Sequence, residues 1–137
     1  MSSKVQRVLK NILFDIKYIT VIHTWKVVYY QAAQNKSPIY DFIENLNDKA
    51  QAKVANSLDL LEQYGIRLGL PHVKKISGTH LWELRILGKD NIRIFYIARI
   101  NKVFLLLHGF LKKKQKTNKR EIKVALERFE EYQKREC

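Results

Sequence analysis

The sequence predicts an α+β domain built on a small, mainly antiparallel sheet of four strands with helices packed on it, preceded by an N-terminal helical extension. Three observations support this prediction. Apolar residues recur with helical spacing between residues 37 and 64, alternate with polar residues between 81 and 99, and return to helical spacing after residue 117. The length of 137 residues suits one such domain, with the element order βααβββα.

The extension is expected to cover residues 1–24 and the main domain residues 25–137. Helical spacing predicts an amphipathic helix over residues 3–17, and a β-branched stretch follows it. The apolar residues of this helix are Val5, Val8, Leu9, Ile12, Leu13 and Ile16. The first strand of the main domain is predicted at residues 25–30.

Two short antiparallel helices are predicted next. Ser37 followed by Pro38 marks a helix start, because a hydroxyl caps free N–H groups and proline suits the first helical position. Asn47 and Asp48 end this helix and cap the second one, and Gly65 is the expected stop.

Residues 81–87 and 92–99 are predicted to form a hairpin around Gly88–Asp90. A three-residue loop places Arg85 opposite Arg93 and keeps the apolar residues together on the core face. A four-residue loop would place Arg93 among them, so the first register is preferred. In this register Glu83 shares the other face with both arginines, and that face is expected to be exposed.

The apolar run within residues 102–110 predicts a central strand covered on both sides, whose second neighbour would be the strand at 25–30. Thr117 or Asn118 is expected to cap a final helix. Its predicted buried stripe is Ile122, Ala125, Leu126, Phe129 and Tyr132.

The net charge of +13 is unevenly distributed. Residues 71–137 hold 17 basic and 7 acidic residues (17 − 7 = +10), whereas residues 25–70 hold five of each. Such an imbalance favours a polyanion partner, with nucleic acid first and a solvated basic face or an acidic protein as alternatives. No stretch has the length of a membrane helix, no secretory signal is evident, and Cys137 is the only cysteine, so the cytoplasm is the expected location.

The four histidines lack metal-ligand spacing, and the glycines form no phosphate-binding loop, so neither metal nor cofactor is expected. A cationic constellation remains as the candidate catalytic site: Arg85, Arg93, His108, Lys112 and Lys113. Guanidinium groups bind phosphate in a bidentate manner, and RNA carries its own nucleophile, the 2′-hydroxyl. A base, an acid and a cationic clamp can therefore cleave RNA.

Further basic residues are expected to bind RNA without transforming it: Lys74, Lys75, His80, Lys114 and Lys116. Two alternatives stay open. The arginines could simply pair with Glu83 and Asp90, and His108 could be a hydrogen-bonded core residue.

Five motifs resemble the RelE/ParE superfamily of bacterial toxin–antitoxin toxins, in its phage-derived, HigB-like branch. They are SPIYDFI at 37–43, LWELR at 81–85, NIRIFY at 91–96, LLHGFLKK at 106–113 and QKTNKREI at 115–122. The resemblance covers residues 25–132. It implies a RelE-like RNase fold, ribosome-associated cleavage of mRNA, and control by a cognate antitoxin, expected to be a helix-turn-helix protein.

By this resemblance, Arg85, Arg93 and the pair Lys112–Lys113 hold the scissile phosphate and move protons. Two features depart from the pattern. The tyrosine that RelE places early in its final helix is missing from residues 115–125, and Thr117-Asn118 replaces the usual Thr-Pro.

The sequence thus indicates a metal-independent endoribonuclease toxin, an mRNA interferase that acts on ribosome-bound mRNA without any membrane association. A ParE-like toxin that inhibits DNA gyrase and a non-catalytic RNA- or ribosome-binding module are the alternatives.

Overall fold

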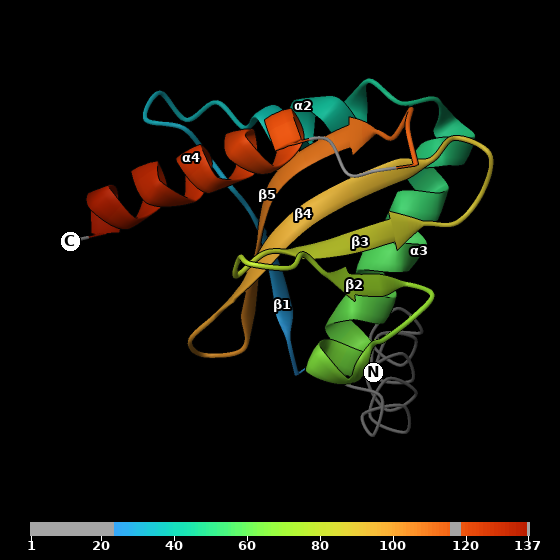
Figure 1. Ribbon diagram of the computed structural model, residues 1–137, viewed down its shortest axis with the longest axis horizontal. Coiled ribbons are helices and arrows are strands. Elements are labelled where there is room, and N and C mark those ends of the chain that lie inside the picture. Colours follow the sequence, from blue (N-terminus) through green and yellow to red (C-terminus); the bar gives the residue numbers. More distant parts are fainter. Residues whose placement is uncertain (1–23, 116–118, 137) are drawn as a thin grey trace, which may run out of the picture.

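The computed structural model describes residues 24–115 and 119–136 (Figure 1). Residues 1–23 of the predicted extension, the predicted helix cap at 117–118 and Lys116 lie outside these ranges. In chain order the elements are β1 (Lys26–Tyr29), α2 (Pro38–Glu44), α3 (Asp48–Tyr64), the 3₁₀ turn η2 (Gly65–Arg67), β2 (Val73–Lys75), β3 (Trp82–Ile86), β4 (Ile92–Arg99), β5 (Val103–Leu111) and α4 (Lys119–Glu136).

The sheet of this part of the chain has five strands in the order β1-β5-β4-β3-β2, so the predicted number of four is wrong. The missed strand, β2, pairs antiparallel with β3 at the edge of the sheet. With three residues it is too short to show an alternating pattern. β1 runs parallel to β5 and the other neighbours are antiparallel, which makes the sheet mixed. β5 lies between β1 and β4, which confirms the prediction of an interior strand whose second neighbour is the first strand.

The predicted hairpin register is confirmed, because Arg85 lies opposite Arg93 and Leu84 lies opposite Ile94. Between β4 and β5 the register shifts at a β-bulge. Phe95 pairs with His108, whereas the next residue, Tyr96, pairs with Leu106. One extra residue in β5 therefore separates two paired segments, and beyond it His108 lies on the same face of the sheet as Glu83 and Phe95.

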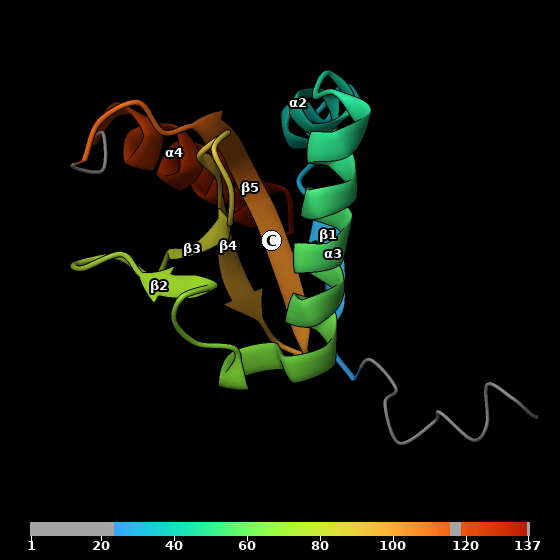
Figure 2. The ribbon, with the colours of Figure 1, turned by 90° about the vertical axis from the view of Figure 1, so that its right-hand side faces the viewer.

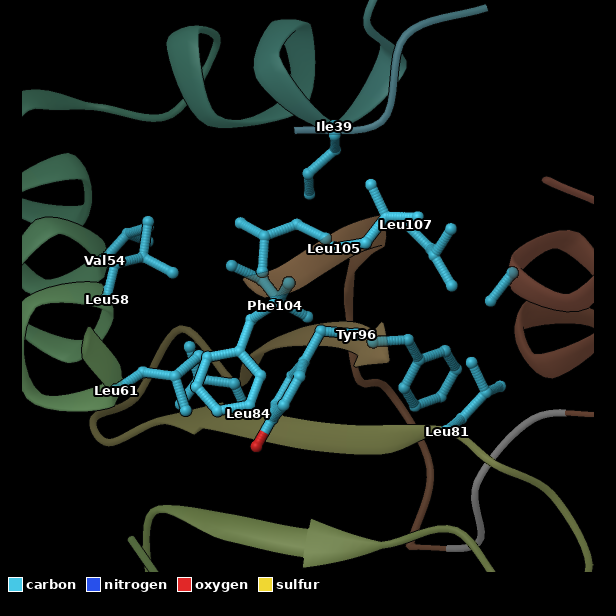
Figure 3. Close-up of a cluster of buried hydrophobic side chains, with 14 of the residues drawn as sticks. Ile39, Val54, Leu58, Leu61, Leu81, Leu84, Tyr96, Phe104, Leu105 and Leu107 are labelled. Atoms are coloured by element: carbon cyan, nitrogen blue, oxygen red, sulfur yellow. The ribbon is translucent and has the colours of Figure 1, made fainter. Parts of the chain in front are cut away.

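Helices α2 and α3 cover one face of the sheet (Figure 2). Their predicted starts are confirmed, since the Ser37 side chain accepts a hydrogen bond from the Tyr40 N–H and Asn47 accepts one from Ala50. Gly65 ends α3 as expected, with a φ of 61° that glycine adopts without a steric penalty. The apolar side chains between these helices and the sheet form the main core, which includes Ile39, Val54, Leu58, Leu61, Leu84, Tyr96 and Phe104 (Figure 3).

Helix α4 packs on the opposite face of the sheet, so the helices do not form a single layer (Figure 2). Ala125 is fully buried against the sheet, and Ile122, Phe129 and Tyr132 are half-buried beside it, as the stripe predicted. Leu126 does not belong to the stripe, because it is exposed. Within the described ranges, no helix combines the length and the apolar character needed to cross a membrane.

The expectation that the α4 side of the hairpin is exposed is wrong for Glu83, whose exposed fraction is 0%. Register predicts which side chains share a face, but it does not predict what covers that face. Here α4 lies over part of the face, and two arginine side chains close on the carboxylate.

Candidate active site

Two arginines from neighbouring strands form the centre of the candidate site. Arg85 on β3 and Arg93 on β4 are direct cross-strand partners on the α4 side of the sheet, as the register predicted. Their side chains are 25% and 15% exposed, so both are partly withdrawn from solvent while still reaching the surface. Two like charges placed directly opposite each other destabilise a sheet unless a third group compensates for them.

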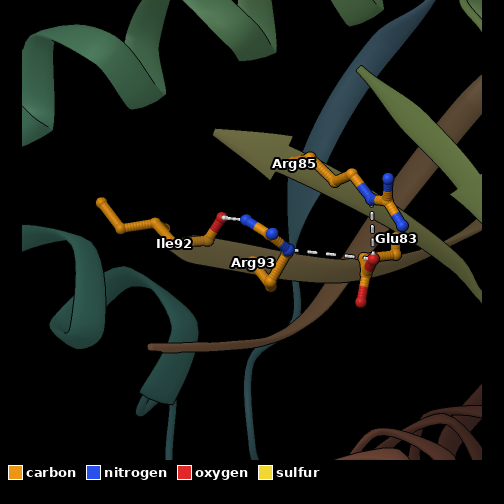
Figure 4. A network of polar contacts seen from close by, with 4 residues as sticks. All are labelled: Glu83, Arg85, Ile92 and Arg93. Carbon is orange, nitrogen blue, oxygen red and sulfur yellow. Dashed lines mark hydrogen bonds and ion pairs between the residues drawn. The ribbon is translucent and has the colours of Figure 1, made fainter. Parts of the chain in front are cut away.

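Glu83 is the compensating group, and it contacts both arginines through a single oxygen (Figure 4). Arg85 Nε donates a hydrogen bond to Glu83 Oε1 at 3.1 Å, and Arg93 Nε lies 3.8 Å from the same oxygen. Arg93 Nη1 also donates to the carbonyl oxygen of Ile92 at 3.1 Å. The pairing with Glu83 that the sequence left open is therefore present, and Glu83 belongs to the site as a residue that sequence reasoning treated only as an alternative partner.

Burial and charge act in opposite directions on Arg93. Desolvation lowers the pKa of its guanidinium, the nearby Glu83 carboxylate raises it, and the charge of Arg85 lowers it again. A guanidinium starts from so high a pKa that it stays protonated under these influences. The site therefore presents two permanent positive charges around one buried carboxylate.

A basic groove adjoins the arginines where β5 ends. The backbone N–H of Lys112 donates to the Asn91 carbonyl oxygen at 2.8 Å, which continues the pairing of β4 and β5 beyond the strand. The groove is open, and its lining consists of Asn91, Arg93, Lys112, Lys113, Lys114 and Gln115. Arg93 and three of the predicted lysines thus lie around one hollow.

His108 lies on the same face of the sheet but is engaged within the protein. Its Nε2 lies 2.9 Å from Glu121 Oε2, and its Nδ1 lies 3.1 Å from Arg128 Nη1, both on α4. Because arginine can only donate, Nδ1 is the acceptor, and the ring proton is assigned to Nε2 and points to Glu121. Burial lowers the pKa of His108, the Glu121 hydrogen bond opposes this shift, and Arg128 adds to it. His108 is thus neutral at pH 7 and connects α4 to β5.

The other predicted RNA-binding residues are spread along the sheet edge. Lys74 on β2 is exposed and pairs with Glu83, which places it on the face of the two arginines. Lys75 lies next to Trp82, with its Nζ 5.2 Å from the ring centroid. His80 is exposed and lines a second groove with Arg99 and Phe129. The structure therefore brings Lys74 to the arginine face, while His80 belongs to a different hollow.

These features define a class: an α+β protein with a cationic groove beside two paired arginines. Among solved structures, the chain is similar to a chain in the crystal structure of the archaeal RelE-RelB complex from Pyrococcus horikoshii OT3. The two sequences are 20% identical, the match covers 66% of this chain and 98% of that chain, and the TM-score is 0.48. No curated protein matches the chain.

Residues 41–130 match the family described as phage derived protein Gp49-like (DUF891). The match covers more than half of the chain, and the chain belongs to this family. It includes β2, β3, β4 and β5, and therefore every described residue of the basic groove. Family membership confirms the phage-derived origin that the resemblance implied.

Proposed function

We propose that this protein is the toxin of a type II toxin–antitoxin system and cleaves mRNA on the ribosome without a metal ion. The observation that carries the proposal is the excess of positive charge at one place on the sheet. Arg85 and Arg93 flank the carboxylate of Glu83, and Arg93 lines one groove together with Lys112, Lys113 and Lys114. Membership of the phage-derived Gp49-like family supports a toxin role.

The pairing of both arginines with Glu83 leaves them able to bind phosphate. Glu83 contacts each guanidinium through Nε, so the outer Nη edge of Arg85 stays available for a second anion. One carboxylate also neutralises only one of the two charges. A guanidinium edge matches two phosphate oxygens, and its interaction strengthens where protein partly excludes water. The arginines are therefore the proposed clamp on the scissile phosphate.

The proposed reaction uses the nucleophile of the substrate. The 2′-hydroxyl oxygen attacks the adjacent phosphorus, the bond to the 5′-oxygen breaks, and the products end in a 2′,3′-cyclic phosphate and a 5′-hydroxyl. One proton leaves the 2′-hydroxyl and one reaches the 5′-oxygen, and Lys112 or Lys113 in the groove is the candidate for these transfers. His108 could assist only after its contacts with Glu121 and Arg128 open.

The proposed partners follow from the same surface. The positive charge of residues 71–137 beyond the site would steer the protein to ribosomal RNA, whose phosphates attract it over a distance set by ionic strength. A nuclease that attacks cellular mRNA requires a restraint, and the proposed restraint is a cognate antitoxin with a helix-turn-helix fold.

The clustering of the basic residues separates the RNase from its first rival. A ParE-like gyrase inhibitor acts through protein contacts and does not require cationic groups to converge on one phosphate. Arg85 and Arg93 are cross-strand partners, and Arg93 lines a groove at the end of β5 with Lys112 and Lys113, which supports phosphate chemistry. A non-catalytic RNA-binding module would show the same binding but no strand cleavage.

The decisive experiment incubates the protein with translating ribosomes and a defined mRNA, and maps new 5′ ends. We expect discrete cleavages whose products end in a 2′,3′-cyclic phosphate and a 5′-hydroxyl, together with unchanged gyrase supercoiling in a parallel assay. Lys112→Ala with Lys113→Ala should abolish cleavage, whereas Lys123→Ala, at an exposed position on α4, should leave it unchanged. Intact mRNA with inhibited supercoiling would establish the gyrase alternative, and intact mRNA with retained ribosome binding would establish the binding module.

A further inference from the structure

Glu83 is a costly residue for a purely structural role. Its exposed fraction is 0%, and Oε2 is buried without a hydrogen-bond partner in the described part of the chain. Moving a carboxylate out of water carries a large free-energy cost. A buried ion pair therefore often stabilises a protein no better than apolar residues of the same size. Stability alone therefore does not account for a carboxylate here.

The geometry around Glu83 suggests what the residue does. A single oxygen, Oε1, lies 3.1 Å from Nε of Arg85 and 3.8 Å from Nε of Arg93. The hydrogen bond at Arg85 Nε restricts rotation of the planar guanidinium, because Nε lies at its inner end, whereas Arg93 Nε is within ion-pair distance of Glu83 and makes no hydrogen bond in the described part of the chain. The Ile92 carbonyl oxygen holds Arg93 at a second point, Nη1. Figure 4 shows both side chains converging on the carboxylate from their own strands.

We propose that Glu83 is a positioning residue that holds the guanidinium groups of Arg85 and Arg93 for one shared RNA phosphate. The inference rests on the proposed function, because it names what prepares that phosphate clamp. A clamp whose groups are already oriented loses less conformational freedom when the substrate binds. Glu83 touches neither substrate nor reacting atoms and acts only through the arginines.

This role predicts an effect whose sign is opposite to that of simple electrostatics. Glu83→Gln removes a negative charge beside a site that binds a polyanion. If the carboxylate acted only through its charge, it would repel RNA, and the substitution would strengthen RNA binding. A positioning carboxylate gives the reverse result, because the glutamine amide keeps only an uncharged, weaker acceptor and holds the two guanidinium groups less firmly. We expect Glu83→Gln to raise the Kd for RNA about tenfold, which corresponds to about 1.4 kcal/mol.

The binding test uses a 2′-O-methyl RNA oligonucleotide, which cannot be cleaved by 2′-hydroxyl attack, and measures Kd by fluorescence anisotropy. The matched control is Glu62→Gln, the same change at a carboxylate that accepts the Val27 N–H. We expect the control to keep the wild-type Kd. In a background of Arg85→Ala and Arg93→Ala, Glu83→Gln should no longer weaken RNA binding, since no guanidinium remains to be positioned. Equal or tighter binding by folded Glu83→Gln in the wild-type background would overturn the proposal.

A second readout does not depend on RNA. In ¹⁵N–¹H spectra of the full chain, the Nε–H signals of Arg85 and Arg93, assigned by Arg→Lys variants, should be protected from exchange. Glu83→Gln should shift the Arg85 signal most, because Arg85 Nε donates the hydrogen bond to Glu83, and the Arg93 signal less, while Glu62→Gln should leave both in place. Unchanged signals would overturn the positioning role. If Glu83→Gln failed to fold, Glu83→Asp would take its place, because aspartate keeps the charge but has a shorter side chain. We expect the same loss of protection from exchange at the arginine Nε–H groups.

The two proposals fail separately. If the wild-type protein binds RNA but does not cleave mRNA, the proposed reaction is wrong, and the Kd and Nε–H comparisons still decide the role of Glu83. If mRNA is cleaved and Glu83→Gln cleaves and binds as well as the wild-type protein, the positioning role alone is wrong.

Discussion

The two faces of the sheet are built for different purposes. On the side of α2 and α3, the central positions of β3 and β4 are apolar and fully buried, as at Leu84 and Ile94. The residues directly next to these, Arg85 after Leu84 and Arg93 before Ile94, lie on the α4 side. The same two strands therefore supply a packed core on one face and a cluster of charges on the other.

This difference teaches where stability and function lie in a small domain. The apolar face stabilises the fold through burial and dense packing, which tolerate little change in volume. The charged face includes a buried carboxylate, a like-charge cross-strand pair and a histidine held neutral between two helix residues. Such arrangements contribute little net stability, and they are typical of functional sites.

Removing a large core side chain should have the largest effect on stability. Phe104 is almost fully buried and stacks on Trp25 with ring centroids 4.3 Å apart. We expect Phe104→Ala to lower the free energy of unfolding by about 3–5 kcal/mol, measured by urea denaturation. Leu126→Ala, at an exposed apolar position on α4, is the control and should change it by less than about 0.5 kcal/mol. A small effect of Phe104→Ala would contradict the assignment of stability to the α2 and α3 side.

Adding a methyl group to the same core should lower the free energy of unfolding by less than removing the Phe104 side chain does. Gly109 faces α2, and a Cβ added there would lie 2.5 Å from Cδ1 of Phe42 and 2.9 Å from Cδ1 of Ile39. We expect Gly109→Ala to destabilise the protein by about 1–3 kcal/mol in thermal or urea unfolding. Gly69→Ala is the matched control, because no atom lies within 4 Å of its added Cβ. Equal stabilities of the two variants would show that α2 packs less closely than described.

On the charged face, His108 should make stability depend on pH. Burial lowers its pKa below the ordinary 6.5, so the unfolded chain binds a proton at a higher pH than the folded protein does. The contribution of neutral His108 to the free energy of unfolding is fully present above pH 6.5. It is lost as the pH falls toward the folded-state pKa, by at most about 1.4 kcal/mol per pH unit. The measurement is urea unfolding between pH 7.5 and 5, with His108→Gln as the comparison. The wild-type protein should lose more stability than this variant on acidification, and parallel curves would contradict the neutral, hydrogen-bonded histidine.

The sequence predicted the features that depend on local chemistry. Ser37 and Asn47 cap helices because their side chains accept N–H bonds that the first turn leaves free. The register of the hairpin follows from keeping apolar residues on one face, and this alone places Arg85 opposite Arg93.

Features that depend on tertiary contacts were missed. The strand β2 is defined by its pairing with β3 rather than by a pattern of its own. Trp82 lies on the apolar face of the hairpin that the register predicts as core, yet it is 36% exposed near the edge of the sheet. Glu83 was placed on an exposed face, and its burial depends on what lies over that face. Glu121 and Arg128 contact His108 and thereby join α4 to β5. These contacts are not indicated by the local spacing of residues in the sequence.

In the proposed function, the charged face of the sheet performs the reaction, while the packed face stabilises the fold. The most direct test is a variant with both Arg85→Ala and Arg93→Ala, measured for mRNA cleavage on ribosomes and for unfolding free energy. We expect cleavage to fall more than about 100-fold, because two groups that stabilise charge on the phosphate are gone. The unfolding free energy should fall by less than it does for Phe104→Ala. Cleavage at the wild-type rate, or a loss of stability as large as that of Phe104→Ala, would contradict the account.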